Sequence, residues 1–214
     1  MACVLVDVDG TLLEGPSIER LFVAHLWRCR LLGPRQIAAG LHFFLRYGLR
    51  YGWLAPIKNK AYLAGLEVSE IARRAAVFVQ ERVACRVRYS LQERLRAHRA
   101  AGAPVMLLSG APDFLVHPLA ASVGADAVAA TVCAQDNAVF SANPPVRHPF
   151  YRDKVTIAAE LCAEFGFALT ECTAYADRAY DLPLLNEVGC AVAVCPDRRL
   201  RRAATRAAWT IIET

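Results

Sequence analysis

Residues 3–11 read CVLVDVDGT, an apolar run that ends at Asp7 and is followed two positions later by Asp9. A short apolar run of this kind predicts a buried strand whose carboxyl end carries both aspartates. Two carboxylates this close repel each other in a low-dielectric site unless a cation neutralises them. Mg²⁺ is the cation that such hard oxygen ligands suit, so the segment indicates a metal site. A loop turn with solvated acids is the alternative.

Comparable apolar runs recur along the chain and alternate with helix-like stretches. This alternation predicts an α/β fold with a Rossmann-like parallel sheet covered by helices on both faces, and such sheets bind ligands at the carboxyl ends of their strands. Around the turn pair Asp136-Asn137, residues 131–142 instead predict a β-hairpin. The further predicted strands are 105–108, 173–175 and 191–194, and the predicted helices are 113–123, 153–165 and 182–188.

The region from residue 15 to residue 88 shows no such alternation. It contains only helix-like stretches, with glycines and Pro34 at their predicted ends. We therefore expect a helical insertion, called the cap, at 15–88, placed directly after the first strand of an α/β core formed by residues 1–14 and 89–214. The helix-like stretches of the cap are 17–32, 34–47, 58–64 and 69–86.

The cap also carries the excess positive charge of the chain. Residues 14–90 hold 13 lysines and arginines against 5 glutamates, whereas the rest of the chain holds 12 basic against 15 acidic residues. The basic residues lie within apolar helical stretches, and no nucleic-acid recognition motif accompanies them. We therefore expect no nucleic-acid partner.

The eight cysteines form no C-x-x-C pair, and most of them lie in apolar runs. This pattern favours reduced core thiols in a cytoplasmic protein over disulfides or a zinc site. The first residues lack the basic start and the cleavage site of a secretion signal, so we expect a cytoplasmic location.

Three further segments place candidate functional groups beside predicted strands and helices. Ser109 and Gly110 follow the second strand, where a hydroxyl and backbone N–H groups can bind an anion, although Ser109 could simply cap the next helix. Lys154 is one of only three lysines, and its compact charge suits a carboxylate and a phosphate oxygen; a surface lysine is the alternative. Asp177 and Asp181 follow the third strand, where Asp177 would complete a metal site and Asp181 would support it, unless either merely caps a helix.

These four segments, in this order and spacing, resemble the motifs of the haloacid dehalogenase superfamily of phosphohydrolases, and nearly the whole chain fits. The insertion after the first strand resembles the helical cap of the phosphoserine-phosphatase-like branch, subfamily IB. The tail is similar to that branch as well, with LLNEVG at 184–189, PDRRLR at 196–201 and Trp209. The resemblance implies a Mg²⁺-dependent phosphatase that passes through an aspartyl-phosphate intermediate.

The resemblance also implies a role for each candidate residue. Asp7 would be the nucleophile, and Asp9 would protonate the leaving alkoxide and then activate water, while its backbone carbonyl contacts the metal. Dehalogenases of the superfamily lack the acid two residues after the nucleophile, so Asp9 favours phosphatase or phosphotransferase chemistry. The remaining implied roles are phosphate binding by Ser109, Gly110 and Lys154, metal binding by Asp7, Asp9 and Asp177, and support of the site by Asp181 and Thr11.

Two regions depart from the family pattern. The fourth motif usually has a glycine before its aspartate and a small residue after it, whereas this chain has Ala176 and Arg178. Arg178 could reach the phosphate, pair with Asp181 or project into solvent, and it leaves open a weakly active or non-catalytic phosphoryl-binding protein. Phosphoserine phosphatases carry an acid about nine positions after the nucleophile, where this chain has Pro16, with Glu14 two residues earlier. Phosphoserine is therefore not the leading substrate.

The cap segment 37–57 mixes aromatic and aliphatic residues with Arg46 and Arg50, which interrupt it before the roughly 18 apolar residues that a membrane span requires. It could lie at the inner face of a membrane, with its arginines toward anionic lipid, or pack as an ordinary part of the cap. A similar cap occurs in the phosphatidylglycerophosphate phosphatases of this branch. The expected substrate is a small phosphomonoester or a phospholipid headgroup, and transfer of the phosphoryl group to an alcohol is the competing reaction.

Overall fold

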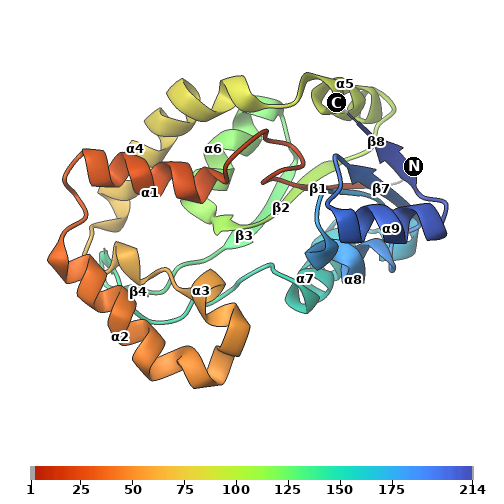
Figure 1. Cartoon of the computed structure of the whole chain (residues 1–214). Helices are drawn as coiled ribbons and strands as arrows, with labels where there is room; N and C mark the ends of the chain where they lie inside the picture. Colours follow the sequence, from red (N-terminus) through yellow and green to blue (C-terminus); the bar gives the residue numbers. More distant parts are fainter. Residues whose placement is uncertain (1–2, 214) are drawn as a thin grey trace.

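The computed structural model describes residues 3–213, and its centre is a six-stranded parallel sheet (Figure 1). Residues 1, 2 and 214 of the predicted core lie outside the described residues. The strand order is β3-β2-β1-β6-β7-β8, so β1 lies between β2 and β6. The prediction of a parallel α/β sheet is confirmed, but none of the predicted strands corresponds to β3 or β8. The strands are β1 (Val4–Asp7), β2 (Val105–Pro112), β3 (Ala127–Thr131), β6 (Thr173–Ala176), β7 (Cys190–Val194) and β8 (Thr210–Ile212).

A separate set of helices covers each face of the sheet, because alternate strand residues point to opposite faces. Val4 and Val6 belong to an apolar cluster with α5 and α6, while Leu5 belongs to a second cluster with α7, α8 and α9. Burial on both faces explains why the strands are almost uninterrupted apolar runs. These helices are α5 (Tyr89–Ala100), α6 (Asp113–Val123), α7 (Arg152–Glu164), α8 (Leu182–Leu185) and α9 (Arg198–Arg206).

Residues 15–88 form helices directly after β1. The buried faces of α1 and α4 join the same apolar cluster as Val4 and Val6, which anchors them to the sheet. In Figure 1, α1 and α4 lie beside α6, whereas α2 and α3 lie farther from the sheet. Within residues 3–213, no helix is both long enough and apolar enough to cross a membrane. The elements are α1 (Ile18–Arg28), α2 (Pro34–Tyr51), η1 (Gly52–Leu54), α3 (Ala55–Lys58), η2 (Ala61–Leu63), α4 (Val68–Phe78), η3 (Val79–Val83) and η4 (Ala84–Arg86).

Several predicted boundaries are wrong. No single helix covers 58–64, because Asn59 is extended between α3 and η2. The stretch 69–86 is α-helical only as far as Phe78 and continues in π-helical and 3-10 turns. Helix α5 has no counterpart among the predicted elements. The helix predicted at 34–47 extends to Tyr51, and those predicted at 17–32 and 182–188 end early, at Arg28 and Leu185.

The predicted hairpin is present but shorter than expected. Strand β4 (Gln135–Asp136) pairs antiparallel with β5 (Val139–Phe140), and Asn137 turns the chain with a φ of 52°. Thr131 belongs to β3 instead of the hairpin.

Candidate active site

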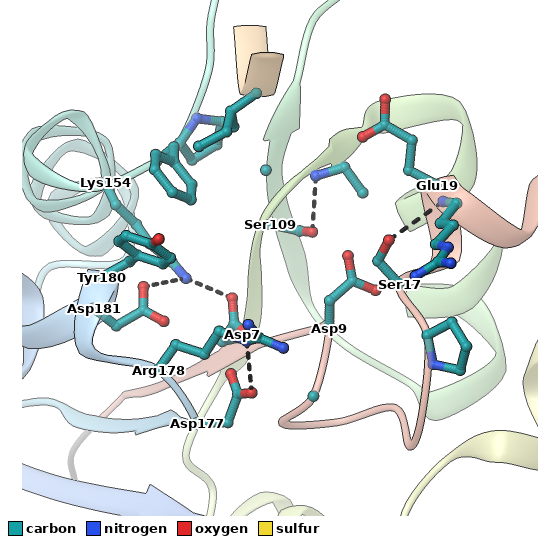
Figure 2. Close-up of a pocket in the computed structure, with 18 of the residues that line it drawn as sticks. Asp7, Asp9, Ser17, Glu19, Ser109, Lys154, Asp177, Arg178, Tyr180 and Asp181 are labelled. Atoms are coloured by element: carbon teal, nitrogen blue, oxygen red, sulfur yellow. Dashed lines mark hydrogen bonds and ion pairs between the residues drawn. The ribbon is translucent and has the colours of Figure 1, made fainter. Parts of the chain in front are cut away.

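Three neighbouring strands deliver polar side chains to one edge of the sheet (Figure 2). Asp7 is the last residue of β1, Ser109 lies in β2 on one side of it, and Asp177 follows β6 on the other side. Because the strands are parallel, their carboxyl ends meet at this edge. Helix α7 adds Lys154 from its first turn. The fold thus brings together residues from four separate segments of the sequence.

Lys154 bridges two carboxylates. Its Nζ donates to Asp7 Oδ1 at 2.6 Å and to Asp181 Oδ1 at 2.7 Å. Burial alone would lower the pKa of Lys154, but the carboxylates of Asp181 and Asp7 outweigh it and raise the pKa above its ordinary value. Burial raises the pKa of Asp181 to about 6, against the attraction of Lys154. The alternative of a surface lysine is wrong, because Lys154 is buried as a cation beside Asp7.

Gly10 and Thr11 fix the position of Asp177 relative to Asp7. The Thr11 hydroxyl lies 3.1 Å from Asp7 Oδ2 and 3.3 Å from Asp177 Oδ1, so its single proton serves either carboxylate. Gly10 has a φ of +88°, and a Cβ atom there would lie 2.1 Å from Asp177 Oδ2. Backbone conformation and space therefore both require glycine at this position.

The carboxylate group fits a hard divalent cation. Oxygen atoms of Asp7, Asp177 and Asp181 lie within 4.8 Å of one another. Burial raises the pKa of Asp177 to about 7, and the charge of Asp7 adds to the rise. A bound divalent cation would relieve this repulsion, and carboxylate oxygens are ligands that Mg²⁺ prefers. Lys154 binds one oxygen of Asp7 and one oxygen of Asp181, so each of these two carboxylates keeps its second oxygen as a candidate ligand.

The side chain of Asp9 stays apart from this carboxylate group. Its Oδ1 accepts the backbone N–H of Ile18, at the start of α1, at 2.7 Å. Burial raises the pKa of Asp9 to about 7; the N–H of Ile18 opposes the rise and the charge of Asp7 adds to it. Asp9 also lines the cavity described below. A carboxyl group that titrates near neutral pH can both donate and accept a proton there.

Ser109 and Gly110 lie in an irregular stretch of β2. The pairing register with β3 shifts between Leu108 and Pro112, and α6 begins only at Asp113. Ser109 Oγ accepts the N–H of Ala111 at 3.1 Å, so the idea that Ser109 caps the helix is wrong. That contact uses a lone pair, which leaves the Ser109 O–H as a donor.

Thr131 and His148 support the Gly110 peptide through its carbonyl oxygen. The sequence patterns do not identify either residue as a candidate. Thr131 Oγ1 donates to the Gly110 carbonyl at 2.7 Å and lies 2.7 Å from His148 Nδ1. Because the one hydroxyl proton of Thr131 goes to the carbonyl, His148 carries its proton on Nδ1. Burial lowers the pKa of His148 to about 3, so the ring is neutral. Gly110, Thr131 and His148 are not neighbours in the sequence, so no local motif predicts that they are in contact.

A cavity of about 620 Å³ opens in front of these groups, and cap residues line it together with residues of the sheet edge. Its acidic cap residue is Glu19, another position that the sequence does not single out. Lys60 Nζ donates to Glu19 Oε2 at 2.5 Å, and the Tyr62 hydroxyl donates to Oε1 at 2.9 Å. Pro16 lines the cavity, whereas Glu14 is exposed and does not line it.

Of the three expected alternatives for Arg178, pairing with Asp181 is wrong, and the exposure of its side chain agrees with projection into solvent. Its Nε lies 3.4 Å from Asp177 Oδ2, its pairing is with Asp177 instead of Asp181, and its side chain is 63% exposed. It also lines the cavity. Exposed ion pairs contribute only ~0–1 kcal/mol, so Arg178 leaves Asp177 available to a metal ion.

Comparison with known sequences agrees with this arrangement. A family model of haloacid dehalogenase-like hydrolases matches residues 4–186. The phosphoserine phosphatase SerB1 of Mycobacterium tuberculosis is 27% identical over 215 residues, which cover 98% of this chain and 70% of that protein.

Solved structures share the fold along almost the whole chain. A Bordetella pertussis Tohama I protein of unknown function superposes with a TM-score of 0.82 at 24% identity, covering 99% of this chain and 97% of that one. A substrate-bound phosphoserine phosphatase superposes with a TM-score of 0.66 at 16% identity, covering 100% of this chain and 93% of that one. At these identities the likeness shows the fold alone.

Proposed function

The chain belongs to the haloacid dehalogenase-like hydrolase family and is a phosphatase, and we propose that it hydrolyses phosphomonoesters with Asp7 as nucleophile and Mg²⁺ as cofactor. The observation that carries the proposal is the environment of Asp7. Lys154 binds one of its carboxylate oxygens, and Thr11 lies within hydrogen-bond distance of the other. These contacts orient the Asp7 carboxylate at the cavity.

In the first proposed step, a carboxylate oxygen of Asp7 attacks phosphorus, and the bond from phosphorus to the leaving oxygen breaks. Asp9, with its pKa of about 7, donates its proton to that leaving oxygen. In the second step Asp9 takes a proton from water, the water oxygen attacks phosphorus, and the bond between Asp7 and phosphorus breaks to release inorganic phosphate. Lys154, the Ser109 hydroxyl and the Gly110 N–H would hold the phosphoryl oxygens in both steps.

Asp7 and Asp177 would hold Mg²⁺, together with the backbone carbonyl of Asp9. When bound, the ion supplies positive charge against the negative charge that develops on the phosphoryl group. Asp181 would act through Lys154, which it holds at 2.7 Å. Thr11 would act through Asp7 and Asp177, between which its hydroxyl lies.

We also propose that residues 15–88 act as the cap of a catalytic core formed by 1–14 and 89–214. Support comes from the cavity, which residues of both parts line. Further support comes from a small contact between the two parts: Trp53 of η1 stacks on Tyr180 at 5.9 Å between ring centroids, and Lys58 pairs with Asp153 at 3.3 Å.

The test is hydrolysis of a phosphomonoester panel, including phosphoserine and glycerol phosphates, by the wild type and Asp7→Asn, with Mg²⁺ and with a chelator. We expect Mg²⁺-dependent activity that falls by at least ~10⁴-fold in the variant, as loss of a nucleophile does in other enzymes. Asp136→Asn, in the exposed hairpin, is the matched control and should keep full activity. Activity that survives in Asp7→Asn would overturn the mechanism.

The same panel distinguishes the two competing functions. A phosphotransferase would convert an added alcohol into its phosphate ester in place of releasing inorganic phosphate. A non-catalytic phosphoryl-binding protein would bind phosphate without turnover of any ester.

The exposed face of α2 favours a second candidate, a phospholipid headgroup substrate at a membrane surface. Leu45 is 86% exposed and Leu49 is fully exposed, and Leu41 on the same helix face is 61% exposed. Arg46 and Arg50 border this apolar stripe. An apolar stripe bordered by arginines is typical of a helix that lies in the headgroup region of an anionic membrane. A cytoplasmic location, at the inner face of the membrane, is part of this proposal.

Sedimentation with anionic phospholipid vesicles at low salt tests the membrane contact. We expect the wild type to sediment and the double variant Leu45→Ser, Leu49→Ser to stay in the supernatant. Val77→Ser, at an exposed apolar position of α4, is the matched control and should sediment like the wild type. Absence of wild-type binding would rule out the lipid version and leave a soluble phosphomonoester as substrate.

A further inference from the structure

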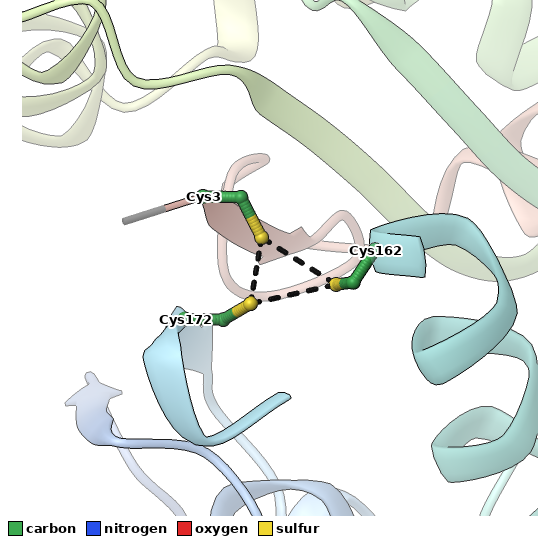
Figure 3. A group of neighbouring side chains, drawn as sticks. All are labelled: Cys3, Cys162 and Cys172. Carbon is green, nitrogen blue, oxygen red and sulfur yellow. Dashed lines mark hydrogen bonds between the residues drawn. The ribbon is translucent and has the colours of Figure 1, made fainter. Parts of the chain in front are cut away.

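Three cysteine side chains meet near the amino ends of β1 and β6, whereas the cavity lies at the carboxyl ends of these strands. Figure 3 shows the three side chains pointing toward one another. Cys3 directly precedes β1, Cys172 directly precedes β6, and Cys162 lies in α7. Their Sγ atoms are 2.7 Å apart between Cys3 and Cys172, 3.4 Å between Cys3 and Cys162, and 3.5 Å between Cys162 and Cys172. All three are free thiols with at most 1% exposure.

This convergence is closer than apolar packing alone requires. Non-bonded heavy atoms in a protein core pack at roughly 3.5–4.0 Å, and the distance from Cys3 to Cys172 is well inside that range. Cys3 is separated from Cys162 and Cys172 by 159 and 169 residues, so the fold and not a local turn assembles the group.

We propose that Cys3, Cys162 and Cys172 form a binding site for one soft, thiophilic metal ion, and that monovalent copper is the ion it fits. The point in the plane of the three sulfur atoms that is equidistant from them lies about 1.9 Å from each. An ion about 1.3 Å out of that plane therefore lies at the roughly 2.3 Å thiolate distance from all three, and a planar site needs each sulfur to move outward by about 0.4 Å.

The donor set distinguishes copper from zinc. Thiolate sulfur binds both Cu(I) and Zn²⁺, but structural zinc is almost always four-coordinate, so a group of three thiolates favours Cu(I). In the described part of the chain, the donor group at this place consists of these three cysteines. The carbonyl oxygen of Ala168, 3.1 Å from Cys172 Sγ, is a hard ligand that Cu(I) does not prefer.

The site would join the three elements that carry the catalytic groups at their other ends. Cys3 lies four residues before Asp7, Cys172 five residues before Asp177, and Cys162 eight residues after Lys154. A bound ion would therefore fasten β1, β6 and α7 together and add its binding free energy to the stability of the folded state. Formation of the copper–sulfur bonds would break the S–H bonds of the thiols and release their protons to water. Because the sulfurs are buried, the ion would enter and the protons would leave as the chain folds.

The test uses the full chain, unfolded and refolded under anaerobic reducing conditions with Cu(I), with Zn²⁺ or with neither, and then dialysed against a chelator. We expect one Cu(I) per chain, a thiolate-to-copper charge-transfer absorption in the ultraviolet, and a raised midpoint of thermal unfolding. Cys162→Ala should bind Cu(I) at least ~10-fold more weakly and lose the thermal shift. Cys133→Ala is the matched control, a buried free thiol outside the group, and should keep both.

Equal Cu(I) retention by the wild type and Cys162→Ala would overturn the site, and so would a preference for Zn²⁺ or a Cys3–Cys172 disulfide as the stable form under reducing conditions. If Cys162→Ala folds poorly, Cys172→Ser supplies the second variant with the same expected loss of copper. The result is independent of the proposed phosphatase mechanism, because copper content and thermal shift are measured without substrate.

Discussion

The two ends of the central sheet are built from the same three elements, β1, β6 and α7, yet they carry opposite chemistry. At the carboxyl end these elements bring Asp7, Asp177 and Lys154 together at a cavity. At the amino end they bring together three cysteines within an apolar cluster that includes α7, α8 and α9. Residues 15–88 line part of the cavity at the first end, whereas the three cysteines at the second end are buried.

The same strand or helix therefore carries charged groups at one end and buried thiols at the other, so the position of a residue along the element decides its role. Charged groups at the carboxyl end are expensive to bury, as the raised pKa values of Asp9, Asp177 and Asp181 show. Neutral thiols at the amino end are inexpensive to bury. Substitutions at the carboxyl end should therefore change activity and stability together, and those at the amino end should change stability alone.

The largest effect should come from Lys154→Met, which removes the cation that holds the carboxyl end together. Asp7 and Asp181 would stay buried without their partner, at a cost of ~3–5 kcal/mol of unfolding free energy. Loss of a phosphate-binding charge should also lower kcat by ~10²–10³-fold. Urea unfolding and steady-state kinetics measure the two effects.

Lys58→Met is the matched control for that experiment. Lys58 pairs with the exposed side chain of Asp153 at 3.3 Å, and loss of such a pair should cost less than ~1 kcal/mol. Equal losses of stability at positions 58 and 154 would contradict the importance assigned to the buried bridge.

Gly10→Ala should separate backbone strain from the crowding of Asp177. Gly10 and Gly166 both have positive φ angles, but only at Gly10 would a Cβ atom meet another group, at 2.1 Å from Asp177 Oδ2. Gly166→Ala is the matched control. Gly10→Ala and Gly166→Ala should each lose ~1–2 kcal/mol of unfolding free energy through backbone strain. Gly10→Ala alone should also raise the Mg²⁺ concentration for half-maximal activity by ~10-fold or more. The same Mg²⁺ requirement in both variants would show that the site absorbs the added methyl group.

The contribution of Asp177 to the stability of the metal-free protein should fall as pH rises from about 4 to 7. The folded-state pKa of Asp177, about 7, lies above its ordinary value of 3.8, so in this range the folded protein binds more protons than the unfolded chain. The free energy of unfolding that this proton contributes is fully present below pH 3.8, the pKa of Asp177 in the unfolded chain. It is lost as the pH rises through about 7, the pKa in the folded protein. Asp9 and Asp181 contribute in the same direction, whereas His148, whose pKa burial lowers to about 3, contributes in the opposite direction.

Urea midpoints at about pH 5 and about pH 8, in a chelator, measure this slope. Relative to the wild type, Asp177→Asn should lose less stability between the two pH values. Mg²⁺ should stabilise the wild type more at about pH 8 than at about pH 5, because it replaces the proton. An unchanged slope in Asp177→Asn would assign the titration to other groups.

Thr131→Val should have a smaller effect, confined to phosphate binding. It removes the hydrogen bond to the Gly110 carbonyl, a loss of ~1–1.5 kcal/mol, so the inhibition constant of inorganic phosphate should rise ~5–10-fold. Thr131→Ser keeps the hydroxyl and should restore binding. A phosphate affinity that is equal in the valine and serine variants would show that the Gly110 peptide needs no such support.

The smallest effect on activity should follow Cys162→Ala in the metal-free protein. Loss of a small buried side chain should lower the unfolding free energy by ~1–2 kcal/mol and change kcat by less than about twofold. A tenfold loss of kcat would instead show that α7 couples the two ends of the sheet.

The sequence predicts that several polar groups meet at the carboxyl ends of the strands, because each of these groups lies next to a regular element. Asp7 and Asp177 come at the ends of apolar strands, and Lys154 begins a helix, so local pattern places all three at one edge. Thr131 and His148 have no such pattern, because their role depends on a contact with Gly110 that only the folded chain creates. The sequence likewise does not predict that Cys3, Cys162 and Cys172 meet, because the spacing rules for metal ligands apply to residues that are close together in the sequence.

The fold follows the same division. Long apolar strands and helices with clear ends are predicted well, as the match at 113–123 shows. Strand β8 has only three residues, and β3 reads AVAAT, so neither carries a strong apolar pattern. The helix predicted at 58–64 fails at Asn59, whose side-chain oxygen accepts the N–H of Ala61 and favours a turn.

Trp53 gives the protein a built-in optical probe. It belongs to the cap segment, yet its ring stacks on Tyr180 and lies edge-on to Tyr151, at centroid distances of 5.9 and 5.8 Å. The emission of an indole ring depends on the groups that surround it, so any separation of the cap from the core would shift the fluorescence of Trp53. Replacing Trp27 and Trp209 with phenylalanine would leave that single emitter, and the opening and closing of the cavity could then be timed without an attached label.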